Sequence, residues 1–437
     1  MVTNMSDARY LAVKLLCKTF AGGSFSNIQL NNGLKNSGLD DRDKKLCSVI
    51  YYGVIERKIY LDYIIEKFSS RPLKKLDDVI LNILRCGIYQ LLFVENIPDS
   101  ATVNESVVLS QKFGKKSASG MVNAILRNFI RQGKKVDLPD NKLERYSIEY
   151  SAPPEFVSSL IEDYGEELTE NLLSDALKIP PVTVHINTLK CTENEFISAL
   201  GKIKAVKNKI IPECFSLSGD ITSTEAFKKG FFHVQDLASQ LCCLSLAPAE
   251  NDIVLDICSA PGGKAFTMAE MMNGKGKIMA FDLHEKRVKL IRDGAERLGL
   301  SNIYANTGDA TKFNPALPKF TKILCDVPCS CSGAVRRKPE IKYKNLNDFS
   351  GLLDIQYNIA ENALNYLAVG GEMVYSTCTL RKAENERVIK KLLANHSEIE
   401  PVTLPEPLGE KFGSSASIFP CHFGSDGFFI SKLRKVR

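Results

Sequence analysis

The stretch Ile253-Val-Leu-Asp-Ile-Cys-Ser-Ala-Pro-Gly-Gly-Lys264 decides the fold predicted for this chain. A short apolar run that ends in an acid is typical of a buried strand, and two adjacent glycines before a helical pattern that continues to about Met272 indicate a strand-to-helix turn. Glycines there let a ligand approach the backbone, and the first turn of the helix presents N–H groups to it. The stretch therefore predicts the first strand and helix of a doubly wound α/β domain, with a ligand site at the turn.

Two further strands extend this layout. Lys277–Phe281 ends in Asp282, 26 residues after Asp256, and an acid at that spacing suits the hydroxyl groups of a ribose. The strand 303–307 is followed by Gly308 and Asp309, and an acid there suits an adenine amino group. The first turn contains neither a Gly-x-Gly-x-x-Gly pattern nor a Gly-Lys-Ser/Thr sequence, so the ligand need not carry phosphates. S-adenosylmethionine fits this description.

Two cysteines follow strands of the same predicted sheet. The apolar run Ile323-Leu-Cys325 leads into Asp326-Val-Pro-Cys329, and Cys378 directly follows the predicted strand 372–377. Ligands bind outside the carboxyl ends of the strands in open α/β sheets, so both thiols and the Asp326 carboxylate are expected to face one pocket. The pattern leaves two interpretations open: reactive thiols in a site, or small buried side chains, which most free cysteines are.

Length and composition indicate a globular protein of two or three domains. The chain has 437 residues, of which 44% are hydrophobic and 25% charged. The start has no signal-peptide pattern and no apolar run approaches the ~18 residues of a membrane span, so we expect a cytoplasmic protein without membrane contact.

Thirteen cysteines, many inside apolar runs, indicate reduced thiols. Cys325-x3-Cys329-x-Cys331 contains no Cys-x2-Cys pair and the five histidines are scattered, so no metal site is expected.

The positive charge is concentrated at the front of the chain. Residues 1–150 hold 23 Lys+Arg against 16 Asp+Glu, whereas the remainder holds 34 against 35. Such asymmetry favours a module that binds a polyanion, with a solvated basic face as the alternative.

Apolar spacing predicts that residues 1–131 are all-helical. Thr102 and Glu105 suggest a capping box at the start of one of these helices. The predicted helices span 8–20, 43–52, 60–68, 76–94, 103–113 and 118–131.

The rest of the chain divides into two further predicted domains after a linker near 133–139. Residues 141–235 mix helix and strand, with helices at 154–164 and 166–176 and an alternating strand at 182–187. A helix at 237–246 precedes the α/β pattern. The predicted domains are therefore a helical domain at 1–135, a small α+β domain at 141–235 and a doubly wound domain at 236–437.

Several segments together carry a family resemblance. The run 97–108, with 113–114 and 122–126, resembles NusB-type helical RNA-binding domains. Four later segments look like motifs of the RNA 5-methylcytosine methyltransferases: Asp256–Lys264, Asp326–Ser330 with Arg336–Lys342, Tyr375–Cys378 and Gly424–Phe429. The whole chain resembles the bacterial RsmB branch of that family, which modifies small-subunit (16S) ribosomal RNA. The resemblance implies a NusB-like RNA-binding domain, a small α+β domain that contacts RNA and a Rossmann-like methyltransferase domain that uses S-adenosylmethionine, in a chain we expect to be monomeric.

The resemblance also implies a covalent mechanism. Carbon 5 of cytosine is a poor nucleophile, so a thiolate first adds to carbon 6, and Cys378 is similar to the family's nucleophile by its place in the Thr-Cys motif. Asp326 is expected to donate a hydrogen bond or proton at N3, and Cys329 to assist release after methyl transfer. Lys264 either holds Asp326 in an ion pair or is a solvated helix residue. The residues implied for the cofactor are Cys258, Ser259, Ala260, Pro261, Gly262, Gly263, Lys264, Asp282, Asp309 and Asp326.

The chain departs from the family pattern at three places. Cys331 and Ser332 stand where the family usually has Gly or Ala followed by Thr, which puts the local shape of the loop in doubt. His185 stands where an arginine is usual, and the segment 152–156 lacks the usual tryptophan, so RNA contacts there cannot be carried over. A basic group near the pocket is expected either to contact phosphates or to form an exposed loop. Its members are Arg336, Arg337, Lys338 and Lys342.

Two other functions remain open from the sequence. An RNA ribose 2′-O-methyltransferase can share an Ala-Pro-Gly-Gly turn, but it needs a Lys-Asp-Lys-Glu set and no pair of thiols. A non-catalytic RNA-binding or antitermination factor is the second alternative, and the intact set of acid and cysteines argues against it.

Overall fold

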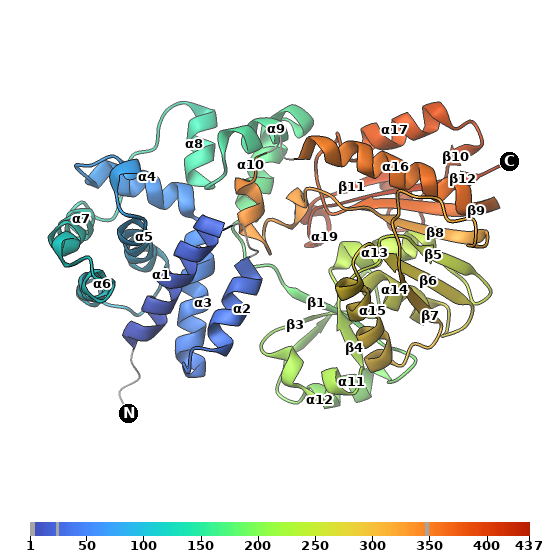
Figure 1. The fold of residues 1–437 in the computed structure, drawn as a ribbon, viewed down its shortest axis with the longest axis horizontal. Coiled ribbons are helices and arrows are strands. Elements are labelled where there is room, and N and C mark those ends of the chain that lie inside the picture. Colours follow the sequence, from blue (N-terminus) through green and yellow to red (C-terminus); the bar gives the residue numbers. More distant parts are fainter. Residues whose placement is uncertain (1–4, 23–25, 346–348) are drawn as a thin grey trace. The chain divides into compact units, whose positions relative to one another are not determined.

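The computed structural model describes residues 5–22, 26–345 and 349–437. The chain forms two compact units, of which the first comprises residues 1–178 and 337–344 and the second comprises 179–336 and 345–437. Figure 1 colours them along the sequence. Each unit has hydrophobic clusters of its own. The division into three domains made from the sequence stays a prediction.

The first unit is helical. Its central helix, α5 (Asp78–Phe93), is apolar on almost all sides and nearly every residue from Ile80 to Leu91 is buried, as expected for a helix surrounded by others. Helices α1, α3, α4, α6 and α7 pack around it. The helices of this unit are α1 (Met5–Gly22), α2 (Ser26–Lys35), α3 (Asp41–Glu56), α4 (Lys58–Phe68), α5, α6 (Asp99–Lys112), α7 (Ser119–Arg131), α8 (Lys142–Glu149), α9 (Pro154–Tyr164) and α10 (Glu166–Asp175).

The helices predicted for this region are confirmed, with two corrections. The apolar pattern does not predict α2, because its ten residues include three asparagines and a glycine, all weak helix formers. The proposed capping box at Thr102 is wrong. Helix α6 begins at Asp99 after Pro98, so Thr102 lies inside the helix, where it is fully buried.

Residues 337–344 belong to the first unit although the residues on both sides of them belong to the second. They contain the short 3₁₀ helix η5 (Pro339–Tyr343). The Glu340 carboxylate accepts hydrogen bonds from the backbone N–H and the hydroxyl of Ser26 at the start of α2, at 3.1 and 2.8 Å. Lys342 donates to the carbonyl oxygen of Glu56 at 2.7 Å and is only 3% exposed. This segment is thus an internal part of the helical unit.

The second unit contains two sheets. The smaller is antiparallel, with the order β2-β3-β1-β4, and encloses a cluster around Val184, Phe196 and Phe232. The larger has eight strands in the order β10-β12-β9-β8-β5-β6-β7, with β11 paired to β12. The strands are β1 (Val182–Ile186), β2 (Ala205–Lys207), β3 (Cys214–Leu217), β4 (Phe232–Val234), β5 (Ile253–Asp256), β6 (Lys277–Asp282), β7 (Ile303–Thr307), β8 (Phe320–Asp326), β9 (Leu367–Thr377), β10 (Ile399–Pro401), β11 (Ser415–Ile418) and β12 (Phe428–Lys435).

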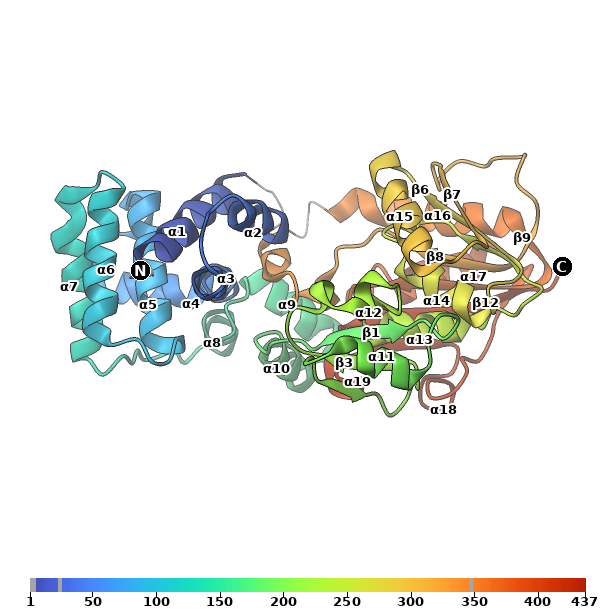
Figure 2. The same ribbon diagram turned by 90° about the horizontal axis from the view of Figure 1, so that it is seen from below.

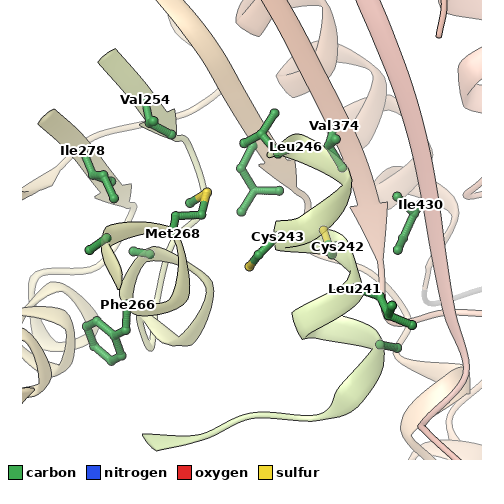
Figure 3. Packing of buried hydrophobic residues seen from close by; sticks show 14 of the residues in the cluster. Leu241, Cys242, Cys243, Leu246, Val254, Phe266, Met268, Ile278, Val374 and Ile430 are labelled. Carbon is green, nitrogen blue, oxygen red and sulfur yellow. The ribbon is translucent and has the colours of Figure 1, made fainter. Parts of the chain in front are cut away.

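Helices cover both faces of the larger sheet, which makes the domain doubly wound as predicted (Figures 1 and 2). One face packs against α13 (Leu237–Leu246), α14 (Gly263–Met271) and α15 (Glu285–Leu298). Figure 3 shows Leu241, Cys242 and Leu246 of α13 with Val374 of β9 and Ile430 of β12 in this layer. The other face packs against α16 (Ser350–Tyr366) and α17 (Glu386–Asn395). The sheet is therefore buried on both sides, and its ligand site lies at the edge formed by the strand ends.

Candidate active site

Five parallel strands bring the predicted site residues to one edge of the larger sheet. Strand β5 pairs in parallel with β6 on one side and with β8 on the other, so the strand order reverses at β5. Ligands bind at such a switch point, outside the carboxyl ends of the strands. The strands that meet at this edge end at Asp256, Asp282, Thr307, Asp326 and Thr377.

Three thiols form a cluster at the ends of β8 and β9. The Sγ atoms of Cys329 and Cys378 are 3.2 Å apart, and those of Cys329 and Cys331 are 3.9 Å apart. All three sulfur atoms lie within 4.8 Å of one another. Each cysteine is partly exposed, and Cys378 packs against the hydrophobic cluster below it, so the thiols lie at the border of the core. The structure thus brings together the two thiols predicted for the site and adds Cys331.

The environment of the cluster raises the pKa of two of its thiols, those of Cys329 and Cys378. Hydrogen bonds with Cys331 and Cys378, together with burial, raise the pKa of Cys329 well above its ordinary value. The hydrogen bond with Cys329 lowers the pKa of Cys378, but the contact with Cys331 and burial outweigh it, so the pKa of Cys378 is also raised. A thiolate therefore forms here only with help from a base or a nearby positive charge.

Asp326 is held from two sides. Lys264 Nζ lies 2.7 Å from Asp326 Oδ2, and the Ser376 hydroxyl donates to Asp326 Oδ1 at 2.8 Å. Burial opposes the charge of Lys264, but the Asp326 carboxylate and the neighbouring thiols of α13 outweigh burial and raise the lysine's pKa. The ion pair is present, and Lys264 is not a solvated helix residue.

Glu384 supports the loop that carries Cys329 and Cys331, and sequence reasoning missed it. Its carboxylate is fully buried and accepts hydrogen bonds from the Ser330 N–H at 2.9 Å, the Ser330 hydroxyl at 2.6 Å and Gln356 Nε2 at 2.9 Å. Arg381 Nη1 is 3.1 Å away. The only signal in the sequence is an acid six residues after Cys378, and its polar neighbours give no sign of burial.

Ser332 takes over a structural role at the position where the family usually has Thr. Its hydroxyl hydrogen-bonds with Thr379 Oγ1 at 2.7 Å and accepts from the Leu380 N–H at 2.9 Å. The Gly333 N–H donates to the carbonyl oxygen of Cys378 at 3.0 Å. These bonds tie the loop after β8 to the loop after β9.

The turn after β5 is shaped to admit a cofactor. Gly262 has a φ of 107°, and a side chain there would run into Phe266. The carboxyl oxygens of Asp256 and the hydroxyl of Ser259 are buried, and no well-formed hydrogen bond satisfies them in the described part of the chain, although the Ser259 hydroxyl is close enough to lower the pKa of Asp256. Burial raises the pKa of Asp256 to about 7. Buried polar groups normally have partners, so these atoms fit a ligand that carries hydrogen-bond donors or positive charge.

The two acids predicted to bind the nucleoside lie at the ends of the next two strands. Asp282 is the last residue of β6, and Asp309 lies two residues after β7. Asp282, only 4% exposed, pairs with Arg287 Nη1 at 2.9 Å, and Arg287 Nη2 donates to the carbonyl oxygen of Ala260 at 2.8 Å. Asp309 accepts from the Thr311 N–H at 3.0 Å and the Thr311 hydroxyl at 2.6 Å. Arg287, which the sequence reasoning did not single out, therefore links the end of β6 to the turn after β5.

A cavity of about 240 Å³ lies beside Asp309. It is bounded by the ends of β5, β6 and β7 and by α16. Its walls include the rings of Phe281, Phe313 and Tyr366 next to Thr307 and Gly308. Apolar walls with a few polar groups are typical of sites for small flat ligands.

The basic group after Cys331 does not form an exposed patch as a whole. Arg336 donates to the carbonyl oxygens of Gly424 and Ser425 and pairs with Asp426 at 3.2 Å, and its side chain is 7% exposed. Lys342 is buried in the first unit. The prediction of phosphate contacts is wrong for these two residues, because both side chains are largely buried and bonded to other groups of the protein.

His185 of β1 is also internal. Its Nδ1 lies 3.0 Å from Gln240 Oε1, and its Nε2 lies 3.2 Å from the carboxylate of Glu270, which is buried in α14. His233 Nδ1 approaches the same carboxylate at 3.6 Å. His185 thus joins the small sheet to the larger domain within the second unit.

Comparison with known proteins identifies the family. Residues 243–434 match the family model described as 16S rRNA methyltransferase RsmB/F, and residues 6–131 match that of the NusB family. The chain is 34% identical over 443 residues to the probable ribosomal RNA small subunit methyltransferase B of Bacillus subtilis. This match covers 98% of this chain and 99% of the Bacillus protein. The chain belongs to the ribosomal RNA small subunit methyltransferase B family. A Synechocystis protein with the same description is 32% identical, covering 99% of this chain and all of that one.

Solved structures share the fold of this chain. A methyltransferase homologue from Pyrococcus horikoshii is 28% identical with a TM-score of 0.60, and covers 68% of this chain and 100% of that one. The structure of PH0851, 24% identical, shares the fold with a TM-score of 0.83 over 98% of this chain and 99% of its own. Both the helical NusB domain and the methyltransferase domain inferred from the sequence are confirmed. None of the helices described for this family member is long and apolar enough to cross a membrane.

Proposed function

We propose that this chain methylates carbon 5 of a cytosine in small-subunit ribosomal RNA, with S-adenosylmethionine as the methyl donor. One observation carries the proposal: the thiols of Cys329 and Cys378 lie 3.2 Å apart at the ends of adjacent strands, in the same site as the Lys264–Asp326 ion pair. Methylation of a pyrimidine at carbon 5 needs a thiol that attacks the ring, a group that stabilises the charge formed, and a group that assists release of the product. All three must lie within reach of one ring.

Cys378 is the proposed nucleophile. Its thiolate adds to carbon 6 of the cytosine, which turns carbon 5 into the nucleophilic carbon of an enamine. The raised pKa of Cys378 means that the thiol must lose its proton as the site assembles. Cys329 is the nearest sulfur and lies on the other loop, so it is placed to assist when carbon 5 loses its proton and the Cys378–carbon 6 bond breaks.

Asp326 is proposed to bind the edge of the cytosine that gains charge during attack. Its Oδ2 is held by Lys264 and its Oδ1 by Ser376, which fix the plane of the carboxyl group. The Lys264 ammonium lies 2.7 Å from Asp326 Oδ2, so its positive charge stands beside the ring edge that gains electron density during attack.

The turn after β5 is proposed to hold the cofactor. The buried and incompletely hydrogen-bonded oxygens of Asp256 and Ser259 and the close-approach glycines fit its amino-acid part, whereas Asp282 and Asp309 fit its ribose and adenine. The remaining members of the turn, Cys258, Ala260 and Pro261, line the same approach. Bound there, S-adenosylmethionine would supply an electrophilic methyl group on a sulfonium.

The helical unit is proposed to bind RNA. A cavity of about 540 Å³ lies between α1, α2 and the turn after α2, and the exposed side chains of Lys14 and Lys18 stand at it. Asparagine and glutamine side chains of α2 line its other side. Ammonium groups beside amide donors are suited to phosphate and sugar contacts, which supply affinity without reading sequence.

Product analysis tests the proposed function. The full-length chain is incubated with small-subunit ribosomal RNA and S-adenosylmethionine carrying a labelled methyl group, and the RNA is digested to nucleosides. Label in 5-methylcytidine supports the proposal. Label in a 2′-O-methylated nucleoside would overturn it in favour of the ribose reaction, and RNA binding without any transfer would favour the non-catalytic alternative.

A further inference from the structure

The cluster of Cys329, Cys331 and Cys378 has a feature that the proposed reaction does not use. That reaction needs two thiols, and the third belongs to Cys331, whose Sγ is 3.9 Å from that of Cys329. Cys331 has a φ of 61°, in the left-handed region that favours glycine and that residues with a side chain rarely adopt. The chain therefore keeps a thiol at a position where glycine would fit better.

We propose that the three thiols form a binding site for a soft divalent cation of the zinc type. Three sulfur atoms around one ion, at about 2.3 Å from it, lie about 3.8 Å from one another. The observed separations are 3.2 Å and 3.9 Å, and all pairs lie within 4.8 Å, so an ion fits after shifts of about 1 Å or less. The expectation from the sequence that the chain has no metal site does not account for this cluster, because it considered Cys325 in place of Cys378.

The donor set determines which ions are suitable. Thiolates favour zinc, cadmium and monovalent copper, whereas magnesium and calcium prefer oxygen. Each thiol gives up its proton to solvent as its sulfur–metal bond forms, and no electron is transferred. Three protein ligands leave one position of a tetrahedral site for water.

Hydrogen bonds from residues outside the cluster hold the two loops that carry the three thiols. Glu384 and Gln356 fix the loop after β8, and the Gly333 N–H joins that loop to the carbonyl oxygen of Cys378. Ligands held by such outer contacts pay less conformational entropy when the ion binds. Metal binding also occupies Cys329 and Cys378, so the ion acts as a reversible inhibitor; this consequence, unlike the binding itself, rests on the proposed function.

Cadmium binding to the full-length chain tests the proposal, because a cadmium–thiolate bond has its own ultraviolet charge-transfer band. The chain is first reduced with a phosphine and freed of metal with a chelator. We compare wild type with Cys331→Ser, Cys331→Gly and Cys421→Ser, the last removing an exposed cysteine outside the cluster. Cys331→Gly suits the left-handed backbone, so loss of binding in this variant cannot be attributed to misfolding.

The expected result is one cadmium ion per chain in wild type and in Cys421→Ser, with the charge-transfer band. Both Cys331 variants should bind cadmium at least about 10-fold more weakly. Losing an outer contact of a metal ligand already weakens metal binding by about that factor, and losing the ligand itself should weaken it at least as much. The proposal is overturned if wild type shows no band, if the Cys331 variants bind as wild type does, or if Cys421→Ser removes the binding.

Zinc inhibition provides a second, separate readout. Each variant's methyl transfer is measured relative to its own metal-free rate, and the zinc concentration for half inhibition should rise at least about 10-fold in Cys331→Gly. An equal response of wild type and this variant would overturn the inhibitory role. If no variant transfers methyl groups at all, the proposed function fails while the cadmium result still decides the metal site.

Discussion

The Sγ atoms of Cys329 and Cys378 lie 3.2 Å apart although 49 positions separate the two residues in the chain. The parallel pairing of β8 with β9 brings both strand ends to one edge, and Asp326 pairs in register with Ser376. Cys378 directly follows β9, and Cys329 lies three residues after the end of β8. The two thiols are thus placed by the sheet, and not by a local turn.

Single replacements of the two thiols should have opposite results. Cys378→Ala is expected to abolish methyl transfer and to form no covalent complex with RNA, because no nucleophile remains. Cys329→Ala is expected to attack and methylate, then to stall with RNA attached through Cys378. A band that survives denaturing electrophoresis measures the complex.

The double variant provides the control for these complexes. The shifted band should disappear when Cys378→Ala is added to Cys329→Ala. A stable complex in Cys378→Ala instead would reverse the roles of the two residues. Full activity in both single variants would rule out the thiol mechanism.

Cofactor affinity should depend on the ionisation of Asp256. Burial raises its pKa from 3.8 to about 7, and a cationic cofactor favours the carboxylate, so affinity should rise about tenfold between about pH 6 and pH 8. Without ligand the sign is reversed: stability from Asp256 is fully present below its unfolded pKa and is lost as the pH rises from about 4 to about 7. Calorimetric titration and denaturant unfolding at several pH values measure the two effects.

Asp256→Asn is the matched variant for both measurements. Its amide does not ionise, so the affinity and the stability attributed to this position should no longer vary with pH. A pH dependence that stays unchanged in Asp256→Asn would assign it to another group.

Asp282→Ala should weaken cofactor binding by about 1.5–3 kcal/mol, the range for hydrogen bonds to a charged group. Arg287 holds the carboxylate in place at the end of β6. Isothermal calorimetry measures the change. Asp293→Ala, which breaks an exposed ion pair with Lys289 on α15, should leave the affinity unchanged. Equal affinities in all three proteins would remove Asp282 from the site.

Glu384→Ala should destabilise the second unit by about 3–5 kcal/mol. The change leaves the buried Ser330 N–H without its acceptor, removes one of the two acceptors of Gln356 Nε2 and removes the partner of Arg381. Denaturant unfolding measures the loss. The exposed Glu400 offers a control, since Glu400→Ala should change stability by no more than about 0.5 kcal/mol. Similar values for the two variants would mean that the Glu384 network contributes little.

Removing both Lys14 and Lys18 should weaken RNA binding and reduce its dependence on salt. Each phosphate contact contributes about 0.7–0.9 to the slope of log affinity against log salt, so the double alanine variant should lose about 1.5. Filter binding at several salt concentrations measures the slope. The pair Lys178 and Lys228, exposed in other parts of the chain, serves as control. A slope equal to that of wild type would exclude the α1 lysines from the RNA contact.

Regular features of the fold could be predicted from the sequence. Three apolar strands end in an acid, at Asp256, Asp282 and Asp326, and a glycine turn follows β5. These features depend on residues that are neighbours in the sequence, so their pattern predicts both the sheet and the edge at which it binds a ligand. The two thiols could be assigned to one pocket because parallel strands share an edge.

Features that depend on packing between distant residues could not be predicted. Nothing near Glu384 signals that it accepts hydrogen bonds from Ser330, 54 positions away. The third thiol, on Cys331, joins the cluster because its backbone adopts a left-handed conformation, which composition does not predict. Arg336 and Lys342 resemble a solvated basic loop in sequence, but partners far along the chain bury both.

The return of residues 337–344 to the helical unit limits how the protein can be divided. A fragment that begins at residue 179 would carry this segment without the residues that surround Lys342 and Glu340, and would expose a lysine whose pKa burial has lowered to about 7. Removing the N-terminal part therefore changes more than RNA affinity. A chimaera between relatives needs three junctions, near 178, 336 and 345, so that both pieces of the helical unit come from the same parent.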